Sequence, residues 1–108
     1  MANTFKNASS SGVGTAYTTV YAAPAATTTV VLGMSLCNTT TAGIVVDVQF
    51  RDTATTAVKM LTSVDIPAGS TLEVLAGQKY ILEATDDIQV KSNTASSLDV
   101  VMGVMEIT

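Results

Sequence analysis

The chain has 108 residues, enough for one modest core, and the 47% of them that are hydrophobic argue against intrinsic disorder. Only 13% are charged and the net charge is −4, so the sequence offers no basic surface for nucleic acid or an anionic membrane. There is no histidine and a single cysteine, Cys37, which excludes an internal disulfide and a Cys–His catalytic pair.

Residues 1–14 are rich in serine, asparagine and glycine, which predicts a flexible N-terminal arm. Ordering each residue costs about 1–2 kcal/mol, and only Phe5 offers much apolar burial in return. We therefore expect the arm to become ordered on a neighbouring subunit, with Phe5 in an apolar recess and Lys6 near an acidic group. The alternative is a strand of the chain's own domain with Phe5 in the core. We expect no secretory signal, because no apolar stretch follows a basic region.

From residue 15 onward, β-branched residues with period-two patterning predict one β-sandwich domain over residues 15–108. The first strands are expected at residues 15–22 and 28–37. In the second strand, one face carries Val30, Leu32, Met34 and Leu36, and the other carries Val31, Gly33, Ser35 and Cys37. Both faces are small or apolar, so we expect a central strand in which Cys37 is buried and reduced.

Residues 44–51 alternate most clearly. One face carries Ile44, Val46, Val48 and Phe50, and the residues between them are mostly polar. This pattern predicts a half-buried antiparallel strand with one face in water. We therefore expect the side chain of Phe50 to lie in the core.

Five further strands are expected in the second half of the chain, at residues 57–66, 71–75, 79–84, 88–92 and 98–107. In the first of them, the inward residues are expected to be Val58, Met60, Val64 and Ile66. About eight strands with turn residues between them predict an all-β fold, an antiparallel β-sandwich or jelly roll. No capped helical stretch competes with this interpretation.

The last strand, residues 98–107, is apolar on both faces, which is unexpected for a small domain. Either the strand is central in its sheet, or a neighbouring chain covers its second face. Together with the arm, its outward residues form the candidate assembly interface: Phe5, Lys6, Val101, Met105 and Ile107.

The sequence contains no convincing catalytic or metal-binding pattern. Without histidine and with one cysteine, a zinc site is effectively excluded. Asp86 and Asp87, helped by Glu83, could offer oxygens to calcium, but their spacing is better explained by a turn. Catalysis by paired carboxylates is not indicated either, because there is no tryptophan to stack on a sugar and five carboxylates fall on outward strand positions: Asp47, Asp65, Glu73, Glu83 and Asp99. We expect no enzyme activity, metal, cofactor or small-molecule substrate.

Three segments resemble small bacteriophage virion structural proteins. Residues 21–38 (YAAPAATTTVVLGMSLCN) resemble the opening pattern YxxPAxxTxVVxxxxxxN of these proteins. Residues 66–70 (IPAGS) and 82–90 (LEATDDIQV) resemble the second half, with its PxG and AxDxIxV turns. One departure is Ala26, which stands where many relatives have glycine and leaves the type of the first turn open.

The resemblance implies a β-sandwich or jelly-roll subunit on the head, neck or tail of a virion, made in the bacterial host cytoplasm, with no enzyme activity and no cofactor. The preferred version is a head decoration or cement protein, a homo-oligomer such as a trimer, that binds the major capsid protein. The alternative is a neck or tail appendage, a fibre or spike module, that binds a host receptor or carbohydrate. This alternative needs exposed aromatics, for which the candidates are Tyr17, Tyr21 and Tyr80.

Overall fold

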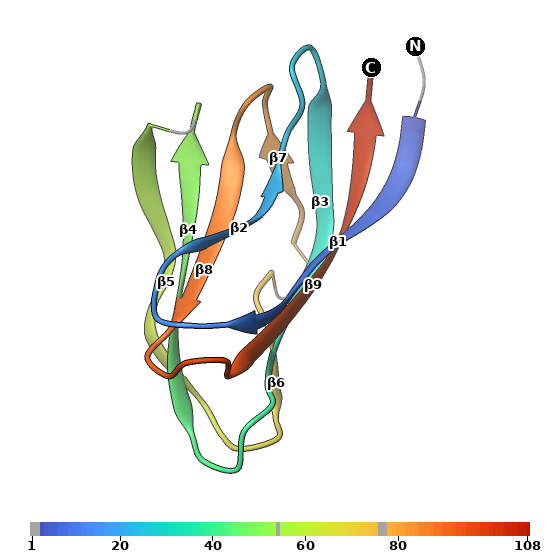
Figure 1. The fold of residues 1–108 in the computed structure, drawn as a ribbon. Helices are drawn as coiled ribbons and strands as arrows, with labels where there is room; N and C mark the ends of the chain where they lie inside the picture. The colour runs from blue at the N-terminus through green and yellow to red at the C-terminus, as the bar shows by residue number, and fades with distance from the viewer. Residues whose placement is uncertain (1–2, 54, 76–77) are drawn as a thin grey trace.

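The computed structural model describes residues 3–53, 55–75 and 78–108, which form nine strands in two antiparallel sheets (Figure 1). Sheet A contains β1 (Asn3–Val13), β9 (Leu98–Ile107), β3 (Thr28–Asn38) and β6 (Thr71–Glu73) in that order, and β7 (Tyr80–Leu82) also pairs with β3. Sheet B contains β2 (Thr18–Ala22), β8 (Asp87–Ser92), β4 (Ile44–Asp52) and β5 (Thr56–Ile66) in that order. The predicted all-β sandwich is confirmed.

The core lies between the two sheets because each strand turns its apolar phase inward. Sheet A contributes Val31, Met34, Leu36, Leu82, Leu98, Val100, Met102 and Val104, and sheet B contributes Ile44, Val46, Val48, Ile66, Ile88 and Val90. The alternation predicted for residues 44–51 is therefore confirmed for its first three apolar side chains. Phe50 is only partly buried, because it lies near the end of β4 opposite Val58, which is 54% exposed.

Residues 3–13 form β1, where the sequence predicts an arm. β1 pairs antiparallel with β9 of the same chain, and its side chains on the inner face are mostly small or polar: Thr4, Lys6, Ala8, Ser10 and Val13. Such a strand is held largely by backbone pairing, so its sequence carries no apolar alternation to reveal it. The strand that the alternative expects is therefore present, but its placement of Phe5 in the core is wrong, because Phe5 is 71% exposed on the outer face. The mobility of this segment in solution stays a prediction.

β-Bulges in β3 and β5 shift the phase that strict alternation predicts. In β3 the register changes between Val31 and Gly33, so Leu32 is an extra residue and is 39% exposed. In β5 the register changes twice, between Lys59 and Leu61 and between Leu61 and Val64, and Leu61 rather than Met60 stands opposite Val48. Alternation alone could not locate these extra residues, because both neighbours of each bulge are compatible with a strand.

The first turn is formed despite the alanine that stands at the glycine position of the related pattern. Ala26 has φ of 57°, in the left-handed region that glycine enters without steric cost. The turn therefore keeps a conformation suited to glycine.

We expect Leu36→Ala to lower the free energy of unfolding by about 2–5 kcal/mol, because Leu36 is fully buried and its removal leaves a cavity. Leu32→Ala on the same strand is the matched control and should cost under about 1 kcal/mol, because Leu32 is already partly in water. Urea unfolding measures both. Equal losses would mean that the phase of β3 is misassigned.

Candidate assembly surface

A row of large apolar side chains crosses the outer face of sheet A. Phe5 on β1 stands opposite Met105 on β9, Met105 stands opposite Val30 on β3, and Val30 stands opposite Ile81 on β7. Directly opposite residues share one face of a sheet. These four side chains, which we call the apolar row, therefore cross four strands side by side.

The apolar row is open to solvent. Phe5 is 71% exposed and Ile81 is 55% exposed, while Met105 and Val30 are partly exposed. Leu32, Val101 and Ile107 add further apolar surface on the same strands. Within the described ranges no other element packs over this face. A contiguous exposed apolar surface of this kind is typical of an interaction site.

Beside the apolar row, the outer face of sheet A carries mostly small side chains and its surface is hollowed. Gly103 on β9 stands between Asn7 on β1 and Gly33 on β3, and two positions further along β9 Val101 stands between Ser9 and Ser35. A hollow of about 270 Å³ lies over Asn7, Gly33, Ser35, Val101 and Gly103. A second hollow of about 360 Å³ follows it, over Ser9, Ser35, Cys37, Asp99 and Val101. The face thus carries its most exposed side chains, Phe5 and Ile81, on the apolar row and is recessed beside it. A further hollow of about 260 Å³ lies between Phe5, Leu32 and Gly103.

Four of the five residues predicted as an assembly interface come together on this face: Phe5, Val101, Met105 and Ile107. Their role in assembly stays a prediction. Sequence reasoning missed Val30, Leu32 and Ile81, which lie on the same face. The missed signal was the apolar character of both faces of residues 28–37, which was interpreted only as evidence for a central strand.

Lys6 does not belong to the outer face. It lies on the inner phase of β1, and its Nζ is 3.0 Å from Oε1 of Glu106 on β9. Tyr21 on β2 donates its hydroxyl to Oε2 of the same carboxylate at 2.5 Å, and that hydroxyl also contacts Thr29. The acidic partner of Lys6 therefore lies in its own chain. The contacts link β1 and β9 of sheet A to β2 of sheet B.

The carboxylate of Glu106 is held in its charged form. The hydrogen bond from Tyr21 and then the ion pair with Lys6 lower the pKa of Glu106 below its usual range, against the opposing effect of burial. Burial, together with donation to Glu106, raises the pKa of Tyr21 to about 12. Tyr21 therefore remains a protonated donor throughout the ordinary pH range.

The outer face of sheet B is polar and internally hydrogen-bonded. Lys59 on β5 donates to Oε1 of Gln49 on β4 at 2.9 Å, and Gln49 donates to Gln89 on β8 at 2.7 Å. Gln89 in turn donates to the hydroxyl of Thr19 on β2 at 3.0 Å. This chain of side chains crosses all four strands, so the face has its polar partners already.

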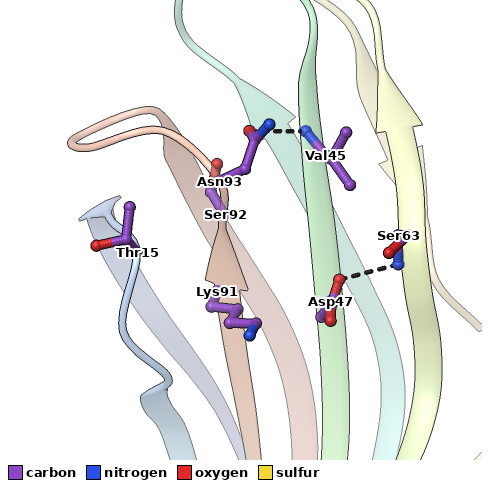
Figure 2. A pocket seen from close by; sticks show the side chains of 7 residues that line it. All are labelled: Thr15, Val45, Asp47, Ser63, Lys91, Ser92 and Asn93. Atoms are coloured by element: carbon purple, nitrogen blue, oxygen red, sulfur yellow. Dashed lines mark hydrogen bonds between the residues drawn. The ribbon is translucent and has the colours of Figure 1, made fainter.

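A hollow of about 270 Å³ lies at one end of that polar face, and Figure 2 shows the side chains that line it. Asp47 on β4 accepts from the backbone N–H of Ser63 at 2.9 Å, and Asn93 accepts from the backbone N–H of Val45 at 3.0 Å. Lys91 stands opposite Asp47 on the next strand. These hydrogen bonds hold the bulge of β5 at Ser63 and the turn at Asn93 in place. The polar groups that line the hollow therefore have a structural role that requires no ligand.

The acidic turn at residues 86–87 also has a structural explanation. Asp86 is 2% exposed and accepts from the backbone N–H groups of Thr53 and Glu83, both at 2.9 Å. Asp87 forms a two-point ion pair with Arg51, with N···O distances of 3.0 and 2.6 Å. In residues 3–53, 55–75 and 78–108, no three His, Cys, Asp or Glu side chains gather to hold a metal ion. Nor does a helix of the described chain have the length and apolar character to cross a membrane.

Two expectations about single residues need comment. The burial expected for Cys37 is wrong: it lies opposite in phase to buried Leu36, as expected, but it is partly exposed because no other described element packs over the outer face of sheet A. The three tyrosines do not form a cluster. Tyr17 contacts Lys59 and Lys91 on sheet B, Tyr21 binds Glu106 between the sheets, and Tyr80 lies on β7 of sheet A.

Solved structures share this fold at low sequence identity. A chain of the disulfide-linked pili of Bacillus endospore appendages is 13% identical, with a TM-score of 0.60 over 98% of this chain and 88% of that one. A chain of the capsid of Helicobacter pylori bacteriophage KHP30 is 13% identical, with a TM-score of 0.58 over 100% of this chain and 89% of that one. A chain of the T13 IBDV viral particle is 10% identical, with a TM-score of 0.50 over 96% of this chain and 34% of that one.

At these low sequence identities, the structural likeness shows a common fold and does not show a common function. The fold is shared with a chain of a phage capsid and with a chain of a pilus. No family model and no curated protein matches the chain.

We expect acid to weaken the link at Glu106. Because the pKa of Glu106 is lowered in the folded state, its stabilisation is present above the unfolded pKa of about 4.3 and is lost as the pH falls through the folded pKa. The thermal midpoint of the wild type should therefore fall more between pH 7 and pH 3 than that of Glu106→Gln. Glu83→Gln, at an exposed carboxylate, is the control and should follow the wild type. Parallel curves for all three proteins would contradict the assignment.

Proposed function

We propose that the chain is a structural subunit of a bacteriophage particle and that it assembles by burying the outer face of sheet A against a neighbouring subunit. The observation that carries this proposal is the apolar row, Phe5, Met105, Val30 and Ile81, which lies exposed across four strands. Leaving such side chains in water forfeits about 1.5–3 kcal/mol each relative to burial. A subunit that functions alone would gain nothing from this arrangement.

The contrast between the two sheets supports the choice of face. The outer face of sheet B has its amides and lysine paired with one another, from Thr19 to Lys59. Among the described residues, the outer face of sheet A has the apolar row and two outward carboxylates, Glu73 and Asp99. Covering sheet A therefore buries apolar surface at a small cost in desolvated charge.

The finer assignment that we propose is a head decoration or cement protein that binds its own copies and the major capsid protein. It is supported by the resemblance of the sequence to virion proteins and by the fold shared with a chain of a phage capsid. The strand order of the two sheets and the alternation of β1 to β4 between them support a jelly-roll description. An appendage that binds receptor or carbohydrate has less support, because the tyrosines share no surface.

We expect Phe5→Ser and Ile81→Ser each to weaken association or attachment to purified particles about tenfold or more, since 1.4 kcal/mol corresponds to a factor of ten. Sedimentation and particle co-sedimentation measure these effects. Both side chains are exposed in the isolated subunit, so the free energy of unfolding should change by no more than about 0.5 kcal/mol.

Val58→Ser is the matched control, because Val58 is 54% exposed but lies on β5 of the other sheet. It should leave association and attachment unchanged. A wild-type chain that is monomeric and does not bind particles would overturn the proposed function.

Cys37 offers a native probe of the same face. Because it is partly exposed, we expect a maleimide to label it in the folded, dissociated subunit. In the assembled state the reaction should slow at least severalfold, since covering the outer face of sheet A also covers the hollow that contains Cys37. Measuring the labelling rate across a dilution series tests this. A rate that does not depend on assembly would place the interface elsewhere.

A further inference from the structure

We infer that the outer face of sheet A packs against the same face of a second copy, with the strands of the two copies antiparallel. The inference rests on the proposed function, since it names the partner of the same surface. The two copies are then related by a two-fold axis that lies in the plane between their two A sheets. The axis runs perpendicular to the strands and passes over Asn7, Gly103 and Gly33, which stand opposite one another.

The two halves of the face are complementary under this rotation. Positions 105 and 101 of β9 lie two residues on either side of Gly103, so Met105 of one copy comes over Val101 of the other. In the same way, Phe5 comes over Ser9, and Val30 comes over Ser35. The protruding apolar row of each copy therefore meets the recessed half of the other. The hollows there measure about 270 and 360 Å³, which is room for the side chain of Phe5.

The distribution of charge favours a two-fold axis across the strands over one that runs along the strands. With the axis along the strands instead, Asp99 of one copy would face Asp99 of the other, and like charges in direct opposition cost free energy. The antiparallel arrangement brings Asp99 over Ile107, at the end of the interface, and Glu73 over Ile81, at its side. No two carboxylates then face each other, which is important for a chain of net charge −4.

The area is adequate for a stable pair. The strands β1, β9 and β3 have ten or eleven residues each, and β6 and β7 have three each. With about 3.3 Å along the strand and about 4.8 Å between strands for each residue, they cover roughly 600 Å² of planar surface. A standard interface buries about 800 Å² on each partner, and side-chain relief adds to the planar value. The glycines at the centre let the two sheets approach without steric conflict, because an added Cβ at Gly33 meets no atom within 4 Å.

Short-range cross-linking tests the geometry. In a Cys37→Ser background, Gly103→Cys puts one thiol of each copy at the two-fold axis, on facing backbones about 10 Å apart, the usual distance between packed sheets. A short bis-maleimide should convert most of this variant to a covalent dimer at low micromolar concentration. A Cβ at position 103 meets only Oδ1 of Asn7 at 4.0 Å, so the variant should fold, and Gly33→Cys is a second variant on the same row.

The wild-type chain is the control, because its native thiol lies away from the axis. Cys37 stands opposite Asp99, and the rotation carries this position over that of Ile107. Positions 99 and 107 are eight residues apart, so the two Cys37 thiols would be about 26 Å apart and out of reach of the reagent. Cross-linking of the wild type through Cys37 would mean parallel copies, in which Gly103→Cys also cross-links, and would overturn the inference.

Sedimentation separates failure of this inference from failure of the proposed function. A dimer whose association is weakened by Phe5→Ser supports the inference, whereas the trimer expected from the sequence overturns it. A wild-type monomer that binds purified particles through Phe5 and Ile81 overturns the inference and leaves the proposed function standing. A monomer that binds neither its own copies nor particles overturns both.

Discussion

Strand β9 has one face in the core and the other on the outside of sheet A, and the rest of the structure depends on the side chains of these two faces. It lies between β1 and β3, and its inner side chains, Leu98 to Val104, close the core against sheet B. Its outer side chains are also apolar, apart from Asp99 and Gly103. Because pairing on both edges satisfies its backbone, only the outer face of β9 lacks a partner within the described chain. That missing partner is the physical basis of the proposed assembly.

The outer faces of the two sheets differ in the polarity of their side chains. The outward side chains of sheet B form a chain of hydrogen bonds that includes Gln49 and Gln89, so water or protein can contact this face with little change in free energy. Sheet A places apolar side chains outward on four neighbouring strands. An isolated domain gains solubility from the first arrangement and loses it from the second. The asymmetry therefore indicates one face for solvent and one for a partner.

The sequence predicts most strands well, because each strand with one face in the core carries its own alternation. Residues 44–51 and 98–107 correspond closely to β4 and β9. Reasoning from alternation fails where burial does not control the side chains. β1 has no apolar inner face, and the bulge at Leu32 moves the following outward residues to the opposite phase from that of simple counting. The complete apolar row also could not be predicted, because β1, β9, β3 and β7 become neighbours only through long-range pairing.

The outward position of Phe5 follows from the register of β1 and not from a preference of Phe5 itself. A slip of one residue would turn Phe5 toward the core, but it would also turn Ala8 and Val13 outward and separate Lys6 from Glu106. The backbone N–H of Gly12 bonds to the carboxylate of Asp99 at 2.9 Å, which holds the far end of the strand in the same register. Several weak contacts thus act together to keep one large apolar side chain in water. Folding of the isolated subunit gains nothing from that exposure, whereas a neighbouring subunit that covers Phe5 would recover the free energy of its burial.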